Sequence, residues 1–114
     1  MPLDIQLKQL PPDIVVLQMT GKITMGEACR QIEWTTRKLL GENQKKIIFD
    51  LSGITHVDST GIGTIVMVAG QVKTAGGELR VAAATQHIDQ LLKTTNLDRI
   101  ISLHSTTEAA GTGF

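Results

Sequence analysis

The chain has 114 residues, of which 41% are hydrophobic, a size and composition that suit one compact domain with its own core. Its 11 basic residues balance its 11 acidic residues, so no net field would draw in nucleic acid or an anionic membrane. No N-terminal targeting pattern is present and no apolar run approaches the roughly 20 residues that span a bilayer, so we expect a cytoplasmic protein without membrane insertion.

The first 21 residues predict a β-hairpin. Residues 3–10 alternate apolar and polar side chains, as in a half-buried strand, and Pro11 and Pro12 then break the pattern. Residues 14–19 are more continuously apolar and should form the more buried strand of the pair. Thr20 and Gly21 are expected to end this strand.

A helix is predicted over residues 25–40, with Gly41 as its stop. Its apolar positions recur at helical spacing: Met25, Ala28, Cys29, Ile32, Thr36, Leu39 and Leu40. Trp34 lies off this stripe, and two roles stay open for it, packing at the helix edge or anchoring a partner.

Residues 46–63 form the central stretch of the chain. A buried strand leads to an expected turn at Ser52 and Gly53 and then to a second extended piece. The polar cluster at residues 58–60 follows, where a second helix should begin. That helix should end near residues 76–77, and its expected core positions are Ile62, Ile65, Val66, Ala69 and Val72.

The remaining elements complete an alternation of strands and helices. We expect a strand at residues 78–84, a helix capped by Thr85, a left-handed residue at Asn96 and a last strand at residues 97–103. The tail, residues 104–114, should fray. This order predicts an α/β fold, a mixed sheet of four to five strands covered by helices, in a single domain at residues 1–114 with its core at 3–103.

Local motifs do not indicate an enzyme. Gly61 and Gly63 belong to no nucleotide-binding motif. His56, Asp58 and Ser59 supply triad residue types, but adjacency in sequence does not give triad geometry, and Val57 stands where the nucleophile elbow of a serine hydrolase needs glycine. Asp58 and Ser59 also suit a purely structural helix start. A hydrolase is kept as an alternative, but we expect no catalytic residue.

No metal or other cofactor is expected either. Cys29 is the only cysteine, and on the predicted first helix it suits a small core residue better than a reactive thiol. His56, His87 and His104 have no metal-ligand spacing with one another or with acidic neighbours.

Three segments carry a family resemblance: IFDLSGITHVDSTGIG at residues 48–63, AGGEL at 75–79 and LLKTTNLDRII at 91–101. Together they resemble the STAS domain family, especially the anti-sigma factor antagonists. The resemblance extends over about residues 3–103, and DSTGIG at 58–63 is its most specific part. It implies a small mixed sheet with helices packed on it.

The resemblance also implies a function. In that family, the serine that corresponds to Ser59 is phosphorylated by an anti-sigma factor that is also a protein kinase, and a phosphatase reverses the modification. The unmodified protein binds the anti-sigma factor and frees the sigma factor. Thr60 is the second choice for the modified residue, and a monomer or weak dimer is expected.

The expected partner surface combines the second helix with the loop after the second strand. Helical projection places Ser59 at the edge of the core stripe and Thr60 outwards with Met67. The candidate partner-binding residues are Asp58, Ser59, Thr60, Gly61, Gly63, Met67, Lys22 and Thr24. At residues 21–24 the chain reads GKIT, where the family commonly has an acidic residue at the second and fourth positions. A constitutive STAS scaffold subunit, as in stress-signalling or lipid-transport complexes, is therefore the alternative.

Overall fold

Five strands form one mixed sheet in the computed structural model, which describes residues 2–114. The sheet order follows the chain: β1 (Asp4–Leu10), β2 (Ile14–Ile23), β3 (Lys46–Val57), β4 (Glu78–Ala82) and β5 (Ser102–His104). β1 is antiparallel to β2, and the other neighbours are parallel. The helices are α1 (Glu27–Gly41), α2 (Ser59–Thr74), α3 (Gln86–Thr94), the 3₁₀ turn η1 (Leu97–Arg99) and α4 (Thr107–Gly111). The α/β architecture predicted from the sequence is confirmed.

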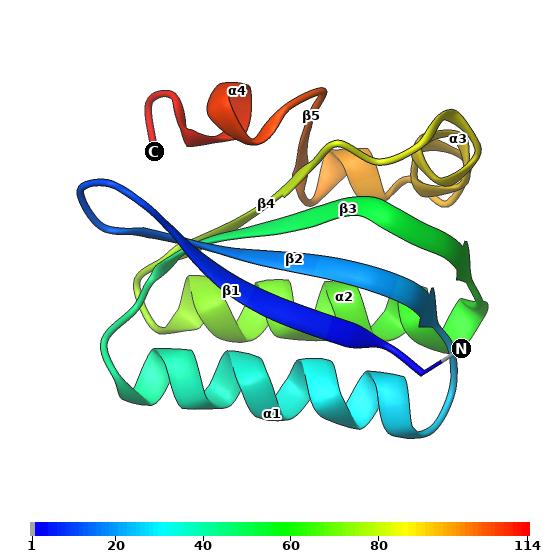
Figure 1. The fold of residues 1–114 in the computed structure, drawn as a ribbon, viewed down its shortest axis with the longest axis horizontal. Coiled ribbons are helices and arrows are strands. Elements are labelled where there is room, and N and C mark those ends of the chain that lie inside the picture. The colour runs from blue at the N-terminus through cyan, green and yellow to red at the C-terminus, as the bar shows by residue number, and fades with distance from the viewer. Residues whose placement is uncertain (1) are drawn as a thin grey trace.

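Helices cover both faces of the sheet. Figure 1 shows α1 and α2 side by side under one face and α4 on the other side, where Ala110 packs with Ile14, Val16 and Ile48. The buried side chains of α3, Ile88 and Leu92, belong to the same core as α1 and α2. Side chains alternate along β3, so Phe49 enters the larger core with α1 and α2, and Ile48 enters a smaller core with α4. Both side chains are fully buried, and each contributes roughly 1.5–3 kcal/mol to stability.

Two expected strand ends lie inside strands. β2 continues past Thr20 and Gly21 to Ile23, and β3 continues past the expected turn at Ser52 and Gly53 to Val57. The glycines mark irregularities in the pairing, because the β2–β3 register shifts between Gln18 and Thr20 and again after Gly21. A Cβ at Gly53 would lie 2.8 Å from the Met19 carbonyl oxygen, so the close approach of the two strands requires glycine there.

The first helix differs from its prediction at both ends. It begins at Glu27, and Met25 lies in the preceding loop with 74% of its surface exposed, so Met25 does not belong to the core. Gly41 is the last helical residue, and the left-handed residue that follows is Asn43, with φ of 63°. Asn tolerates this conformation because its short polar side chain bonds locally.

The second helix begins at Ser59, as predicted, and ends at Thr74, just before the predicted end at residues 76–77, and its buried positions differ from the predicted stripe. Ile62 and Val66 are only partly buried, although both pack against the larger core. The buried positions are Gly61, Thr64, Ile65, Val68, Ala69 and Val72.

The segment after α3 forms less strand than predicted. Asn96 has the expected left-handed conformation, with φ of 63°. η1 then occupies the start of the expected strand, and β5 is only three residues long. Leu97 and Ile101 are buried in the larger core, so their apolar character reflects packing of the turn, not a long strand.

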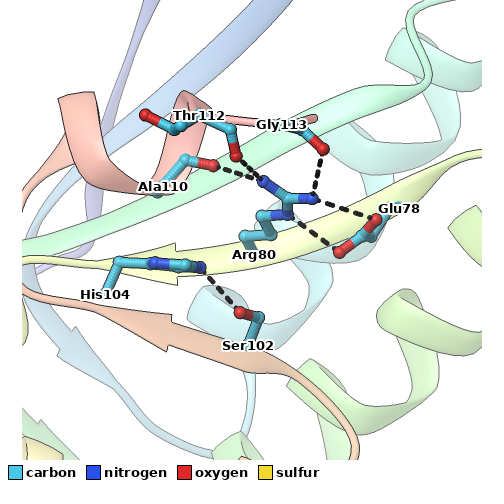
Figure 2. Close-up of polar contacts among 7 residues, drawn as sticks. All are labelled: Glu78, Arg80, Ser102, His104, Ala110, Thr112 and Gly113. Carbon is cyan, nitrogen blue, oxygen red and sulfur yellow. Dashed lines mark hydrogen bonds and ion pairs between the residues drawn. The ribbon is translucent and has the colours of Figure 1, made fainter.

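The C-terminal tail is packed against the sheet, contrary to the expected fraying. Figure 2 shows the Arg80 guanidinium of β4 donating to main-chain carbonyls of the tail, at 2.8 Å to Ala110 and 2.9 Å to Thr112. Glu78 holds the same guanidinium from the other side, with 2.8 Å between Oε2 and Nε. The Phe114 ring lies 4.1 Å from the guanidinium carbon, a cation–π distance. Residues 2–114 contain no helix long and apolar enough to cross a membrane.

Candidate functional site

The candidate site lies at the edge of the sheet where β2 and β3 end. These strands are parallel, so their carboxyl ends meet at one edge, and α1 and α2 both begin there (Figure 1). Loops at this edge of an open sheet are the usual place for ligand or partner contacts. The cluster at residues 58–60 stands directly after β3.

Asp58 is the residue that holds this edge together. Its Oδ1 accepts a hydrogen bond from the Gly61 N–H at 2.7 Å, which caps α2. Its Oδ2 accepts from the Met25 N–H at 2.9 Å, which ties the loop before α1 to the start of α2. These two hydrogen bonds hold the pKa of the Asp58 carboxyl below its ordinary value, and the bond from Met25 has the larger effect. Asp58 is therefore negatively charged at neutral pH.

Gly61 lies inside the packing and not on the partner surface, which corrects the prediction for this residue. It is buried, and a Cβ there would lie 2.2 Å from the carbonyl oxygen of Ile23. The same carbonyl accepts the Asp58 N–H at 3.2 Å. Gly61 thus allows α2 to start against the end of β2, and it is unavailable to a partner.

Ser59 and Thr60 are exposed on the first turn of α2. Within residues 2–114, neither hydroxyl takes part in a hydrogen bond. Gly63 is also exposed, and a Cβ there would have no heavy atom within 4 Å. Met67, one turn further along, is 42% exposed. The outer face of α2 therefore presents two free hydroxyls, open backbone and an adaptable apolar side chain.

The end of β2 and the loop after it border this face unevenly. Thr24 is half-buried and adjoins Met25, whose N–H bonds Asp58, so this part of the loop lies beside the α2 start. Lys22 pairs in register with His56. Because side chains alternate along a strand and Ile23 faces the helical layer, Lys22 points to the opposite face and lies at the margin of the site.

Met25 is the site residue that sequence reasoning misses, since apolar periodicity places it in the core stripe of the first helix. Gly26, with φ of 106°, precedes α1 and places Met25 in the loop. The glycine next to Met25 was the signal that could have shown this. Met25 is the most exposed large hydrophobic residue in the described part of the chain.

The other residues singled out from the sequence take structural positions. His56 Nδ1 lies 2.9 Å from the Thr55 hydroxyl, while Asp58 bonds main-chain N–H groups, so these side chains form no catalytic relay with Ser59. Cys29 is buried, and its Sγ lies 3.3 Å from the Thr24 carbonyl oxygen, as suits a core residue. No group of three or more His, Cys, Asp or Glu side chains in residues 2–114 has metal-binding geometry.

The chain belongs to the STAS domain family, whose family model matches residues 5–110. A relative from Thermotoga neapolitana, provisionally named an anti-sigma factor antagonist, is 28% identical over 98 residues, which is 86% of this chain and 87% of that protein. The crystal structure of a protein from Thermotoga maritima with the same provisional name has a TM-score of 0.83 and 25% identity, over 93% of this chain and 90% of its own.

Structures with lower identity show the same fold. The phosphorylated form of the Bacillus cell fate determinant SpoIIAA has a TM-score of 0.70 and 17% identity, covering 93% of this chain and 96% of its own. A sulfate transporter family protein from Wolinella succinogenes has a TM-score of 0.78 and 13% identity, covering 90% of this chain and 85% of its own. The fold therefore occurs in regulators and in transporter-family proteins alike.

Proposed function

We propose that this protein is an anti-sigma factor antagonist regulated by phosphorylation at Ser59. Unmodified, it binds an anti-sigma factor through the outer face of the α2 start; that anti-sigma factor is also the kinase that modifies Ser59, and a serine phosphatase restores binding. The protein itself is a binding module, not an enzyme, and it acts in the cytoplasm. The observation that carries the proposal is the exposed Ser59 hydroxyl, which follows the capping Asp58 and has no hydrogen bond to any group of residues 2–114.

The electrostatics of this position suit a switch that spares the fold. A phosphoserine adds roughly −1.5 to −2 charges at neutral pH. The N-terminus of α2 tolerates negative charge there, and the exposed side chain leaves room for it. In a complex, the added charge would stand beside the ionised Asp58 carboxylate, where repulsion and desolvation oppose burial against a partner.

The proposed partner surface follows from exposure around Ser59. Thr60, Gly63 and Met67 extend it along α2, and Met25 adds an exposed apolar side chain from the loop before α1. Asp58 and Thr24 border it, and Lys22 lies at its margin. Small residues let a partner backbone approach α2 closely, while the methionines offer contacts that adapt to the partner's shape.

Phosphorylation can be tested with the anti-sigma kinase isolated from the native host. The protein is incubated with this kinase and ATP, and the modified residue is located by mass spectrometry. We expect one phosphate on Ser59, loss of modification in Ser59→Ala and retained modification in the matched control Thr60→Ala. Modification at Thr60 with Ser59 untouched would move the site by one residue, and modification elsewhere would refute it.

One observation favours a second candidate, the constitutive scaffold. Lys22 and Thr24 stand where the family commonly has acidic residues, at the end of β2 and in the loop that follows it beside the proposed surface. A pull-down from the native host distinguishes the two candidates. Recovery of a kinase-type anti-sigma factor supports the switch, whereas recovery of transporter or scaffold subunits, unaffected by Ser59→Asp, supports the alternative.

A further inference from the structure

The outer edge of the sheet at β1 has no partner in the described chain. β1 is the first strand of the sheet, and within residues 2–114 it pairs with β2 alone. It has seven residues, whereas β5 at the other edge has only three. A long edge strand exposes a row of main-chain N–H and C=O groups, which is a template for pairing with another strand.

The two faces of β1 have different characters. On the α1 face, Ile5 and Leu7 line a groove of about 270 Å³ together with Trp34 of α1. Leu7 is 50% exposed and Trp34 is 61% exposed, so large apolar surface lies beside the free edge. On the opposite face, alternation places the exposed Asp4 and Lys8.

We propose that this edge binds a second copy of the same chain, with the two β1 strands antiparallel about a twofold axis at Gln6. In this register Asp4 lies opposite Lys8 of the partner subunit, and Lys8 lies opposite the partner's Asp4. Ile5 lies opposite the partner's Leu7 on the other face, again twice. The strand is thus self-complementary in charge and in apolar character, as a symmetric interface requires.

Neighbouring registers lack this complementarity. With the axis at Leu7, Asp4 would face the partner's Leu10; with the axis at Ile5, it would face the partner's Gln6. The axis at Gln6 also pairs odd residues with odd and even with even. In an antiparallel edge strand, every second residue directs its main-chain N–H and C=O groups outwards. Because odd residues pair with odd and even with even, the outward-pointing groups of one β1 strand meet those of the other.

The proposed interface is separate from the Ser59 surface. β1 lies at the edge of the sheet, whereas Ser59 follows the central strand β3 (Figure 1). A dimer would leave both proposed partner surfaces open. Dimerisation and binding of an anti-sigma factor can therefore fail independently in experiments.

Sedimentation velocity over protein concentrations from about 1 μM to 1 mM tests the proposal, a range that covers weak and moderate association. We expect concentration-dependent dimers for the wild type. Lys8→Asp and Asp4→Lys each place like charges opposite one another at two positions, and each should weaken dimerisation by roughly tenfold to a hundredfold. The double variant Asp4→Lys/Lys8→Asp exchanges the two charges. It should restore the dissociation constant of the dimer to within about threefold of the wild-type value.

Two controls keep the test specific. Lys73→Asp on α2 makes the same change in net charge away from β1 and should leave dimerisation unchanged. Leu7→Ser, at the apolar face, should weaken it without a charge change, and circular dichroism verifies that each variant is folded. A protein that remains monomeric at every concentration, or dimers that Lys8→Asp and Leu7→Ser do not weaken, would overturn the proposal.

Discussion

At the residue scale, Asp58 joins structure to the proposed function. The sequence predicted it as the start of α2 and as a neighbour of the modified serine. Its second hydrogen bond, to the Met25 N–H, joins residues 33 positions apart and depends on the tertiary fold. No local pattern could reveal that contact, just as none revealed that Gly61 is packed against Ile23.

The loss of stability on substitution of Asp58 should follow the number of hydrogen bonds that each substitution removes. Asp58→Asn keeps one acceptor oxygen and loses one of the two main-chain bonds, whereas Asp58→Ala loses both. Thermal unfolding should therefore show the midpoint falling from wild type to Asn to Ala. Equal midpoints for the three proteins would contradict the role assigned to the carboxylate.

The stability conferred by the Asp58 carboxylate should depend on pH. Its pKa is lowered in the folded protein, so the charged form stabilises the fold above the ordinary aspartate pKa of about 3.9. This stabilisation is lost as the pH falls through the lowered native pKa. In urea unfolding from pH 6 to pH 2, the advantage of the wild type over Asp58→Asn should shrink towards acid. An advantage that grows in acid would refute this assignment.

Gly61 and Gly63 form a matched pair for testing the packing of α2. Gly61→Ala places a methyl group 2.2 Å from the Ile23 carbonyl oxygen, and we expect a loss of about 1–3 kcal/mol in unfolding free energy. Gly63→Ala meets no atom within 4 Å and should gain about 0.5–1 kcal/mol from helix propensity. Urea unfolding measures both, and a stable Gly61→Ala variant would contradict the close contact.

At the element scale, the order of strands and helices was predictable because apolar periodicity sets most of it. The errors fall where tertiary contacts override local signals. Gly21 and Gly53 look like turn residues, yet they lie within strands that approach closely. The tail looks like a fraying end, yet Arg80 and the small core under α4 hold it on the sheet.

Arg80 should control the order of α4. Arg80→Met keeps an apolar stem of similar length but removes the donors to the tail carbonyls and the cation over Phe114. Amide hydrogens of α4 should then exchange at least about tenfold faster, as expected for a loss of 1.4 kcal/mol or more. Arg30→Met, which breaks an exposed ion pair with Glu27, is the control and should leave that exchange unchanged.

At the scale of the whole molecule, one STAS domain presents two separate surfaces. The outer face of the α2 start carries the proposed phosphorylation switch, and the β1 edge carries the proposed self-association. The first could be proposed from sequence because its motif is continuous along the chain. The second depends on which strand lies at the edge of the sheet and on Trp34 standing beside it, and neither follows from local pattern.

The most direct test of the central claim is calorimetric titration of the native anti-sigma factor with this protein before and after phosphorylation at Ser59. We predict that the unmodified protein and Ser59→Ala bind, while the phosphorylated protein and Ser59→Asp bind roughly a hundredfold more weakly or not at all. Circular dichroism should show the same fold for all four. Equal affinity of the phosphorylated and unmodified proteins would contradict the account.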